Sequence, residues 1–392
     1  MFITLNELEF PSHTVFRLSM FQTPIKLPVF LPKILQRVLF CLIAGGIMLL
    51  FVASPTDDND MPANFKPFPC FMDADDENTD DSIIRLDDVL RADVKPTQGK
   101  NIFFHETSCH PPGSKYIMNL TARQACSIES AALHNPNFGV FVLFASPTYL
   151  PGAESPKLPL IEALQSYKNV HLRQLNIWRY AKGTPAEEWV NKGDLFDSSY
   201  LKEHVSDYLR ILSLYRFGGI YLDIDVVVLR TMENIPLNYV GAEEPGALCN
   251  AVFSLDSTGI GHEIAELCLN DFQENFNGQG YISNGPSLVM RMTKQVCNST
   301  SIEEIVAEQR NCNGFRVFNT TAFYPIPWPA WRRFVEPQYL NETLEQTKDS
   351  YLIHLWNKVS KELKFKKGDD TAYGKYAQEH CPKVNAAADE YF

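Results

Sequence analysis

Residues 204–230 read HVSDYLRILSLYRFGGIYLDIDVVVLR and contain the most informative pattern of this chain. The first part repeats apolar side chains every three or four residues, which predicts a helix with one apolar face. We expect the helix to end at Gly218-Gly219, because glycine adopts the positive φ of a C-terminal cap at little cost. The apolar run 226–229 predicts a buried strand after it.

Two acids, Asp223 and Asp225, stand between the glycines and this apolar run. In extended backbone, side chains two residues apart point to the same side. Paired carboxylates beside a buried strand are unfavourable unless a cation lies between them, and divalent cations prefer such oxygen ligands. The pattern therefore predicts a divalent metal site, with solvated turn residues as the structural alternative.

Residues 206–229 resemble the core of sugar-nucleotide glycosyltransferases that carry a DXD motif. More narrowly, they are similar to the family of lactosylceramide 4-alpha-galactosyltransferases and the related alpha-1,4-N-acetylglucosaminyltransferases. The resemblance runs from about Asn101 to the C-terminus, and the HETSC form is similar to the arthropod branch. The other motifs follow in the family's order: IFFHETSC at 102–109, CSIESAALHNP at 126–136, NGPSLVMRM at 284–292, FYPIPWPAW at 323–331 and HLWNK at 354–358.

The pattern of apolar residues predicts an α/β domain in which strands and helices alternate. This alternation indicates a mostly parallel sheet with helices on both faces, and the resemblance implies the GT-A fold, a single Rossmann-like domain. The expected strands lie at 101–105, 138–144, 170–175, 239–242 and 251–255, the further helices at 123–134, 158–167, 262–276 and 286–297, and a connector at 189–193.

Residues 38–53 form an uncharged apolar run that is short for a membrane span, for which about 17–25 residues are usual. Basic residues precede the run and aspartates follow it, so the basic flank is expected to stay cytoplasmic. A cleaved signal peptide is the alternative, but the run begins far from Met1 and no clear cleavage site follows closely. The predicted order is a cytoplasmic tail at 1–37, a transmembrane signal-anchor at 38–53, an acidic flexible stem at 54–100 and a lumenal catalytic domain at 101–392.

A lumenal position agrees with the cysteines and the glycosylation signals. Of the 9 cysteines all but Cys41 lie outside the apolar run, which leaves an even number for an oxidising compartment. Cys297 with Cys312 is the first predicted disulfide, and Cys109 with Cys126 is the second. Asn-x-Ser/Thr signals occur at Asn119, Asn298, Asn319 and Asn341. The net charge of −12 argues against nucleic acid as a partner.

The resemblance implies that the acid pair binds a divalent metal that faces the diphosphate of a UDP-sugar. Asp223 and Asp225 are thus the predicted catalytic and metal-binding residues, since the metal would neutralise the leaving diphosphate. Residues 351–356 predict a strand, and a late histidine often completes the metal site in similar glycosyltransferases, so His354 is the third expected ligand. An imidazole beside two carboxylates favours Mn²⁺ over Mg²⁺. A structural histidine is the alternative.

Asp207 and Arg210 share a face of the central helix. Either they form an ordinary ion pair, or, as in similar enzymes, they act on the donor sugar. Asp207 would then accept hydrogen bonds from sugar hydroxyls while Arg210 orients it or meets a phosphate. Gly219 would let the backbone approach the ligand, unless it serves only as a helix cap. The other donor-side candidates are Thr107 at the end of the first strand, Tyr221, and Asn250, which precedes Ala251 where galactosyltransferase relatives have glycine.

On the acceptor side, Asn284 of the NGP motif is the candidate residue. Tyr324, Trp328 and Trp331 could stack on sugar rings or face lipid, although core packing is the more ordinary role for at least one of them.

The predicted function is that of a Golgi type II membrane glycosyltransferase. It would transfer galactose or N-acetylgalactosamine from a UDP donor, in α1,4 linkage, to a terminal sugar of a glycosphingolipid. The resemblance implies retention, and a front-face attack assisted by the departing phosphate is the default, since no acid is identified as a nucleophile. The alternatives are an alpha-1,4-N-acetylglucosaminyltransferase acting on glycoprotein glycans, a non-catalytic carbohydrate-binding relative, and a phosphohydrolase. The last is disfavoured because the acids precede the predicted strand rather than follow it.

Overall fold

The computed structural model describes residues 68–73, 82–110 and 114–392, which belong to one compact unit. The predicted cytoplasmic tail and the predicted span at 38–53 lie outside the described residues. Among the residues that are described, no helix has the length and apolar character needed to cross a membrane.

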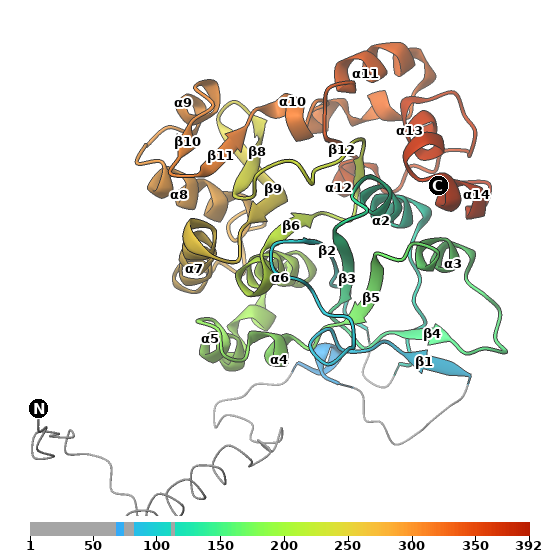
Figure 1. Ribbon diagram of the computed structural model, residues 1–392, viewed down its shortest axis with the longest axis horizontal. Coiled ribbons are helices and arrows are strands. Elements are labelled where there is room, and N and C mark those ends of the chain that lie inside the picture. The colour runs from blue at the N-terminus through green and yellow to red at the C-terminus, as the bar shows by residue number, and fades with distance from the viewer. Residues whose placement is uncertain (1–67, 74–81, 111–113) are drawn as a thin grey trace, which may run out of the picture. The chain divides into compact units, whose positions relative to one another are not determined.

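The unit is built on an eight-stranded sheet with the order β10-β11-β8-β9-β6-β2-β3-β5 (Figure 1). The pairs β5-β3, β3-β2, β2-β6 and β8-β11 are parallel, and only β9 and β10 run against the other strands of this sheet. The predicted mostly parallel sheet is therefore confirmed. The strands are β2 (Asn101–Glu106), β3 (Gly139–Phe144), β5 (Val170–Gln174), β6 (Gly219–Leu222), β8 (Tyr239–Glu244), β9 (Ala247–Leu255), β10 (Asn311–Cys312) and β11 (Phe315–Phe318).

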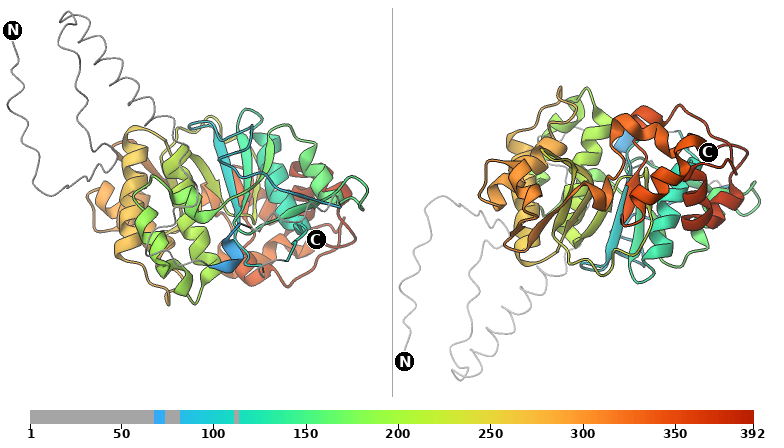
Figure 2. Two further views of the ribbon diagram at one scale, coloured as in Figure 1. Left: turned by 90° about the horizontal axis from the view of Figure 1, so that it is seen from below. Right: turned by 90° about the horizontal axis from the view of Figure 1, so that it is seen from above.

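Apolar side chains on both faces of this sheet explain why helices cover both. Ile102 and Phe104 of β2 belong to one hydrophobic cluster, whereas Phe103 between them belongs to the other. Figure 2 shows the strands between the two helical layers. The first cluster includes side chains of α2 (Ala122–His134), α3 (Pro159–Gln165), α13 (Ala372–His380) and α14 (Pro382–Ala387). The second includes side chains of α4 (Ile177–Ala181), α5 (Glu187–Lys192), α6 (Leu201–Phe217), α7 (Gly259–Glu274) and α8 (Pro286–Val296).

The remaining described elements are short and lie outside the main sheet. A two-stranded sheet pairs β1 with β4, and another pairs β7 with β12. Their bounds, with those of the other helices, are β1 (Ile83–Arg85), β4 (Tyr149–Pro151), β7 (Val226–Val228), β12 (Leu352–His354), α9 (Ile302–Ala307), α10 (Thr320–Phe323), α11 (Leu340–Thr347) and α12 (Asn357–Ser360).

The predicted strands and helices appear within three residues of their expected bounds, except that β9 begins at Ala247 instead of 251, but the connector at 189–193 is wrong. Most of that segment belongs to α5, which ends at Gly193 with a φ of 85°. The helix forms because Trp189 is buried, with its ring edge-on against Phe272 at a centroid distance of 5.5 Å. This tertiary contact outweighs the weak local pattern.

The acid pair lies in a turn rather than in extended backbone. β6 ends at Leu222, Ile224 and Asp225 form the turn, and Val226 N donates to Asp223 O at 3.3 Å. The expectation of a continuous extended segment is therefore wrong, and β6 was not predicted. Because the acids both follow one strand and precede another, their place in the chain does not separate this protein from the phosphohydrolases.

Gly218 and Gly219 allow the chain to pass against its own backbone. They have φ values of 60° and 115°. A Cβ at Gly218 would lie 2.4 Å from Ser257 N, and one at Gly219 would lie 2.4 Å from Asn101 O. Gly219 also begins β6, whereas Asp223 follows its opposite end. The close approach seen here is therefore to the chain's own backbone, and this geometry gives no support to the predicted donor contact of Gly219.

The predicted disulfide between Cys297 and Cys312 is confirmed. The second predicted pair is wrong, because Cys109 bonds to Cys70 and Cys126 bonds to Cys381. The partner of Cys126 lies 255 residues away, so sequence spacing gave no sign of it. The remaining described cysteines, Cys249 and Cys268, are buried and free.

Parts of the segment predicted as a stem belong to the folded unit. Phe71 and Val89 are buried in its core, and Cys70 is tied to Cys109. Ile83–Arg85 forms β1, which pairs with β4. The described residues before Asn101 thus contribute to the domain itself.

We expect Gly219→Ala to destabilise the fold strongly. The alanine would have to adopt the positive φ of this position, and its Cβ would overlap the Asn101 carbonyl of the neighbouring strand. The free energy of unfolding should therefore fall by more than about 2 kcal/mol. Gly246→Ala is the matched control, because a Cβ there meets nothing within 4 Å in an exposed turn. Denaturant unfolding of both variants measures the difference, and equal stability would contradict this account of the β6 start.

Candidate metal and donor site

Three chain segments bring Asp223, Asp225 and His354 together. Asp223 follows β6, Asp225 precedes β7, and His354 ends β12 opposite Val226. One potential ligand atom from each of the three residues lies within 4.8 Å of the others. The predicted third ligand thus lies beside the acid pair, 129 residues away from Asp225 in sequence.

Asp225 is buried and fully engaged with the C-terminal part of the chain. Its Oδ1 lies 3.0 Å from His354 Nε2, and its Oδ2 accepts a hydrogen bond of 2.8 Å from Asn357 N. Trp356 adopts the left-handed region at φ 56°, which turns the chain so that this N–H reaches the carboxylate. Strain of this kind beside a predicted ligand is typical of functional sites.

Asp223 is more open and is held from the opposite side. Its side chain is 29% exposed, its Oδ1 accepts a hydrogen bond of 2.7 Å from the Tyr221 hydroxyl, and Arg210 Nη1 lies 3.2 Å away. The Arg210 guanidinium also lies over the Tyr221 ring, 4.3 Å from its centroid. Tyr221 therefore supports Asp223, one of the predicted metal ligands, through its hydroxyl.

Arg210 directs its guanidinium entirely to protein partners. Its Nη1 donates to Asn250 O at 2.7 Å, and its Nη2 donates to Ser206 Oγ at 3.0 Å and lies 3.2 Å from Asp207 Oδ1. Burial by itself lowers the pKa of Arg210, but Tyr221, Asp223 and Asp207 raise it overall, so the charge is permanent. The geometry favours the prediction that Arg210 orients acids, and it does not support contact with a phosphate.

Asp207 and Asn250 form the donor-side part of this network. Asn250 Nδ2 donates to Asp207 Oδ1 at 2.8 Å, which leaves Oδ2 without a hydrogen bond among the described residues. Burial raises the pKa of Asp207 to about 6, and Arg210 opposes that shift. Gly285 covers the pair so closely that a Cβ there would lie 2.4 Å from both side chains. The free oxygen is the group that can accept a hydrogen bond from a sugar hydroxyl.

The cluster of three residues fits a divalent metal by its chemistry. Burial raises the pKa of Asp225, but the charge and hydrogen bond of His354 lower it overall. Burial lowers the pKa of His354, and Asp225 raises it overall. Each group of this pair therefore favours the charged form of the other, and two carboxylates with one imidazole are a ligand set that suits a divalent metal.

Several other predicted residues do not join this cluster. Thr107 Oγ1 donates to Lys202 O at 2.8 Å, which ties β2 to the start of α6. Asn284 exchanges two hydrogen bonds with the backbone of Asn277, so both ends of its amide are used within a loop. Each of these side chains is thus bound to the protein backbone, and their predicted donor and acceptor contacts stay predictions. Tyr324 is buried and hydrogen-bonded to β9, whereas Trp328 is 51% exposed and Trp331 is half-buried.

The predicted glycosylation signals lie at the surface, with Asn119, Asn298 and Asn341 exposed and Asn319 half-buried.

Sequence reasoning missed residues that support the site through the backbone. Gly285 packs on Asp207 and Asn250, and Asn357 binds Asp225 with its N–H. Both belong to motifs that carry the family resemblance, NGP and HLWNK, which were the available signal. Their roles could not be derived from the sequence, because a packing contact and a backbone N–H do not depend on a characteristic side chain.

Two family models match the chain. The one described as "Alpha 1,4-glycosyltransferase conserved region" covers residues 257–388, and the one described as "Glycosyltransferase sugar-binding region containing DXD motif" covers residues 121–244. The acid pair falls in the second region, and His354 falls in the first. The candidate metal site of Asp223, Asp225 and His354 therefore joins two regions that the family models describe separately.

The chain is similar along most of its length to curated enzymes. The lactosylceramide 4-alpha-galactosyltransferases of Pan troglodytes and Homo sapiens are each 33% identical over 301 residues, which cover 76% of this chain and 79% of the relative. The alpha-1,4-N-acetylglucosaminyltransferase of Homo sapiens is 27% identical over 262 residues, which cover 66% of this chain and 74% of the relative.

We expect Asp223→Asn and Asp225→Asn each to weaken Mn²⁺ binding by at least about tenfold, because each removes a charged ligand atom from the cluster. Asp225→Asn should also lower the melting temperature, since it leaves the buried His354 without its counter-charge. Glu243→Gln is the control: it removes a charge that acts on His354 but no atom of the cluster. Electron paramagnetic resonance of free Mn²⁺ measures the binding, and a loss in Glu243→Gln equal to that in the aspartate variants would show that only net charge matters.

Proposed function

Because the chain belongs to the family of the lactosylceramide 4-alpha-galactosyltransferases, and is therefore a hexosyltransferase, we propose that it transfers galactose or N-acetylgalactosamine from a UDP donor in α1,4 linkage. The proposed acceptor is the terminal sugar of a glycosphingolipid. The observation that carries the proposal is the cluster of Asp223, Asp225 and His354 next to the Asp207–Asn250 pair. The first group suits a metal and diphosphate, and the second suits a sugar.

The site residues would have separate roles toward the diphosphate and toward the donor sugar. A divalent ion held by the cluster, which we propose to be Mn²⁺, would supply positive charge for the departing diphosphate. Arg210 fixes Asp207 and Asp223 in one network, so the sugar-binding and metal-binding acids keep their relative position. The free oxygen of Asp207 would accept a hydroxyl of the donor sugar. Within a GT-A fold, we propose a retaining front-face attack assisted by the departing phosphate.

One observation favours a second candidate. Ala251 follows Asn250 where galactosyltransferase relatives have glycine, and its side chain is completely buried. A relative that is an alpha-1,4-N-acetylglucosaminyltransferase also matches most of the chain. The donated sugar would then be N-acetylglucosamine, and the acceptor a glycoprotein glycan.

The full chain, purified in detergent with Mn²⁺, should slowly hydrolyse the UDP-sugar that it uses as donor. The complete chain is preferable to a fragment that begins near residue 100, since such a fragment would leave Cys109 without Cys70. Release of UDP from UDP-galactose, UDP-N-acetylgalactosamine and UDP-N-acetylglucosamine identifies the donor. Asp225→Asn should lower the rate by about 10²–10³-fold. Glycan binding without turnover of any of these donors would instead indicate a non-catalytic carbohydrate-binding protein.

We further propose a Golgi location with a single type II span at 38–53 and a lumenal catalytic domain. Protease added to intact Golgi vesicles should remove at most the N-terminal tail, because the membrane shields everything after the span. Immunoblotting with an antibody to the C-terminus measures protection, and detergent-treated vesicles are the control. Digestion of the C-terminal domain in intact vesicles would contradict this topology.

A further inference from the structure

Helix α2 touches the acid turn through a buried serine. Ser127 Oγ lies 3.0 Å from Ile224 O and 3.2 Å from Arg123 O, so its one proton is shared between these two carbonyls with the shorter contact to Ile224, the residue between the two acids. Ser127 is completely buried, so water does not compete for this contact. The carbonyl sets the plane of the peptide that links Ile224 to Asp225, and the serine therefore bears on the direction of the Asp225 side chain.

One helical turn earlier, Arg123 holds the segment that follows His354. Its guanidinium donates to Ser360 O at 3.0 Å, to Leu363 O, and to Asn357 Oδ1 at 3.4 Å. Asn357 is the residue whose N–H binds Asp225 Oδ2. The same face of α2 thus contacts both chain segments that meet at Asp225.

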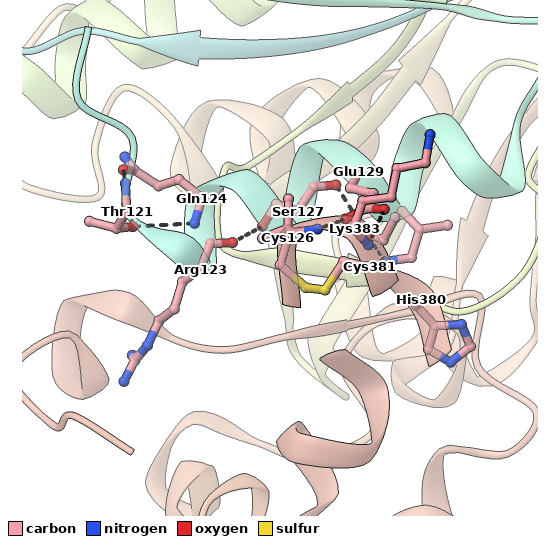
Figure 3. Close-up of a disulfide and its surroundings, with 12 residues drawn as sticks. Thr121, Arg123, Gln124, Cys126, Ser127, Glu129, His380, Cys381 and Lys383 are labelled. Atoms are coloured by element: carbon pink, nitrogen blue, oxygen red, sulfur yellow. Dashed lines mark hydrogen bonds between the residues drawn. A yellow bond between two sulfur atoms is a disulfide. The ribbon is translucent and has the colours of Figure 1, made fainter. Parts of the chain in front are cut away.

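α2 is itself anchored to the C-terminal helices, as Figure 3 shows. Cys126 forms a disulfide with Cys381, and the buried Glu129 carboxylate accepts hydrogen bonds from the backbone N–H groups of Lys383 and Val384 at 2.9 and 2.6 Å. These contacts fix the helix between the acid turn and the C-terminal segment. A fixed helix can hold the acid turn in place.

We propose that Ser127 and Arg123 are positioning residues for the metal cluster. Neither residue would touch the metal or the donor, and each acts through Asp225: Ser127 by way of the Ile224 carbonyl and Arg123 by way of Asn357. The inference rests on the proposed metal-dependent function, because it assigns a role toward the same cluster. Groups that orient the ligands of a metal commonly change its affinity by about 10–100-fold.

Ser127→Ala tests the proposal, and Ser130→Ala is its matched control. Ser130 lies on the same helix and is equally buried, and its hydroxyl accepts a hydrogen bond of 3.0 Å from Val228 N, beyond the acid turn. Both variants remove one buried hydroxyl that binds the backbone of the same chain segment. Melting temperatures of the two full-length variants report any shared loss of stability.

Hydrogen exchange of the metal-free protein is the first measurement. In Ser127→Ala, the amides at 223–226 and that of Asn357 should exchange about fivefold faster, the factor that one neutral hydrogen bond contributes. In Ser130→Ala they should stay as in the wild type. Unchanged exchange in Ser127→Ala, or an equal rise in both variants, would overturn the proposal.

Mn²⁺ binding, followed by electron paramagnetic resonance, is the second measurement. Ser127→Ala should bind Mn²⁺ about tenfold more weakly than the wild type, and Ser130→Ala should bind it equally well. Equal affinity of Ser127→Ala and the wild type would overturn the positioning role. If the wild type binds no Mn²⁺, the metal-dependent function fails and the role toward a metal fails with it, whereas the exchange data still show whether Ser127 orders the acid turn.

Discussion

The buried guanidinium of Arg210 holds three elements of the site together. Its side chain is 7% exposed and lies between Asp207 of α6, Asp223 after β6 and the Asn250 carbonyl of β9. Removing one partner from such a group leaves a buried charge without compensation, so the arrangement tolerates little change. Arg210 consequently links α6, the end of β6 and β9 through one positive charge. The relative position of the donor-side residues depends on these contacts.

The balance is incomplete without a further cation, and this is what makes the arrangement a site. Three carboxylates, Asp207, Asp223 and Asp225, converge on Arg210 and His354. His354 supplies the second positive charge only while it carries a proton, which the neighbouring Asp225 favours against the effect of burial. A divalent ion would replace that proton and add charge for an anionic ligand. An intact acid pair beside His354 agrees with a catalytic protein better than with a binding protein that needs no metal.

Local patterns in the sequence were sufficient for much of the fold. The central helix, its end at the two glycines, the strand at Val226–Val228 and the disulfide between Cys297 and Cys312 depend on residues close together in the chain. The metal cluster is different, because 129 residues separate Asp225 from His354. Spacing could not have joined them, and resemblance to known glycosyltransferases supplied that prediction.

The predictions that failed share a physical cause. The acid turn was expected to be extended, but it contacts His354 at the end of β12, Asn357 after it, and Ser127 on α2. Arg210 was a candidate for phosphate binding, but its guanidinium is bound to protein partners such as Asn250 O. Gly219 was a candidate for close approach to the ligand, but it lies against the backbone of Asn101. In each case the residue type was read correctly, but its role is determined by a segment far away in sequence. The DXD motif therefore provides two of the candidate ligands. The conformation of the motif is determined by contacts with α2, earlier in the chain, and with the end of β12, later in the chain.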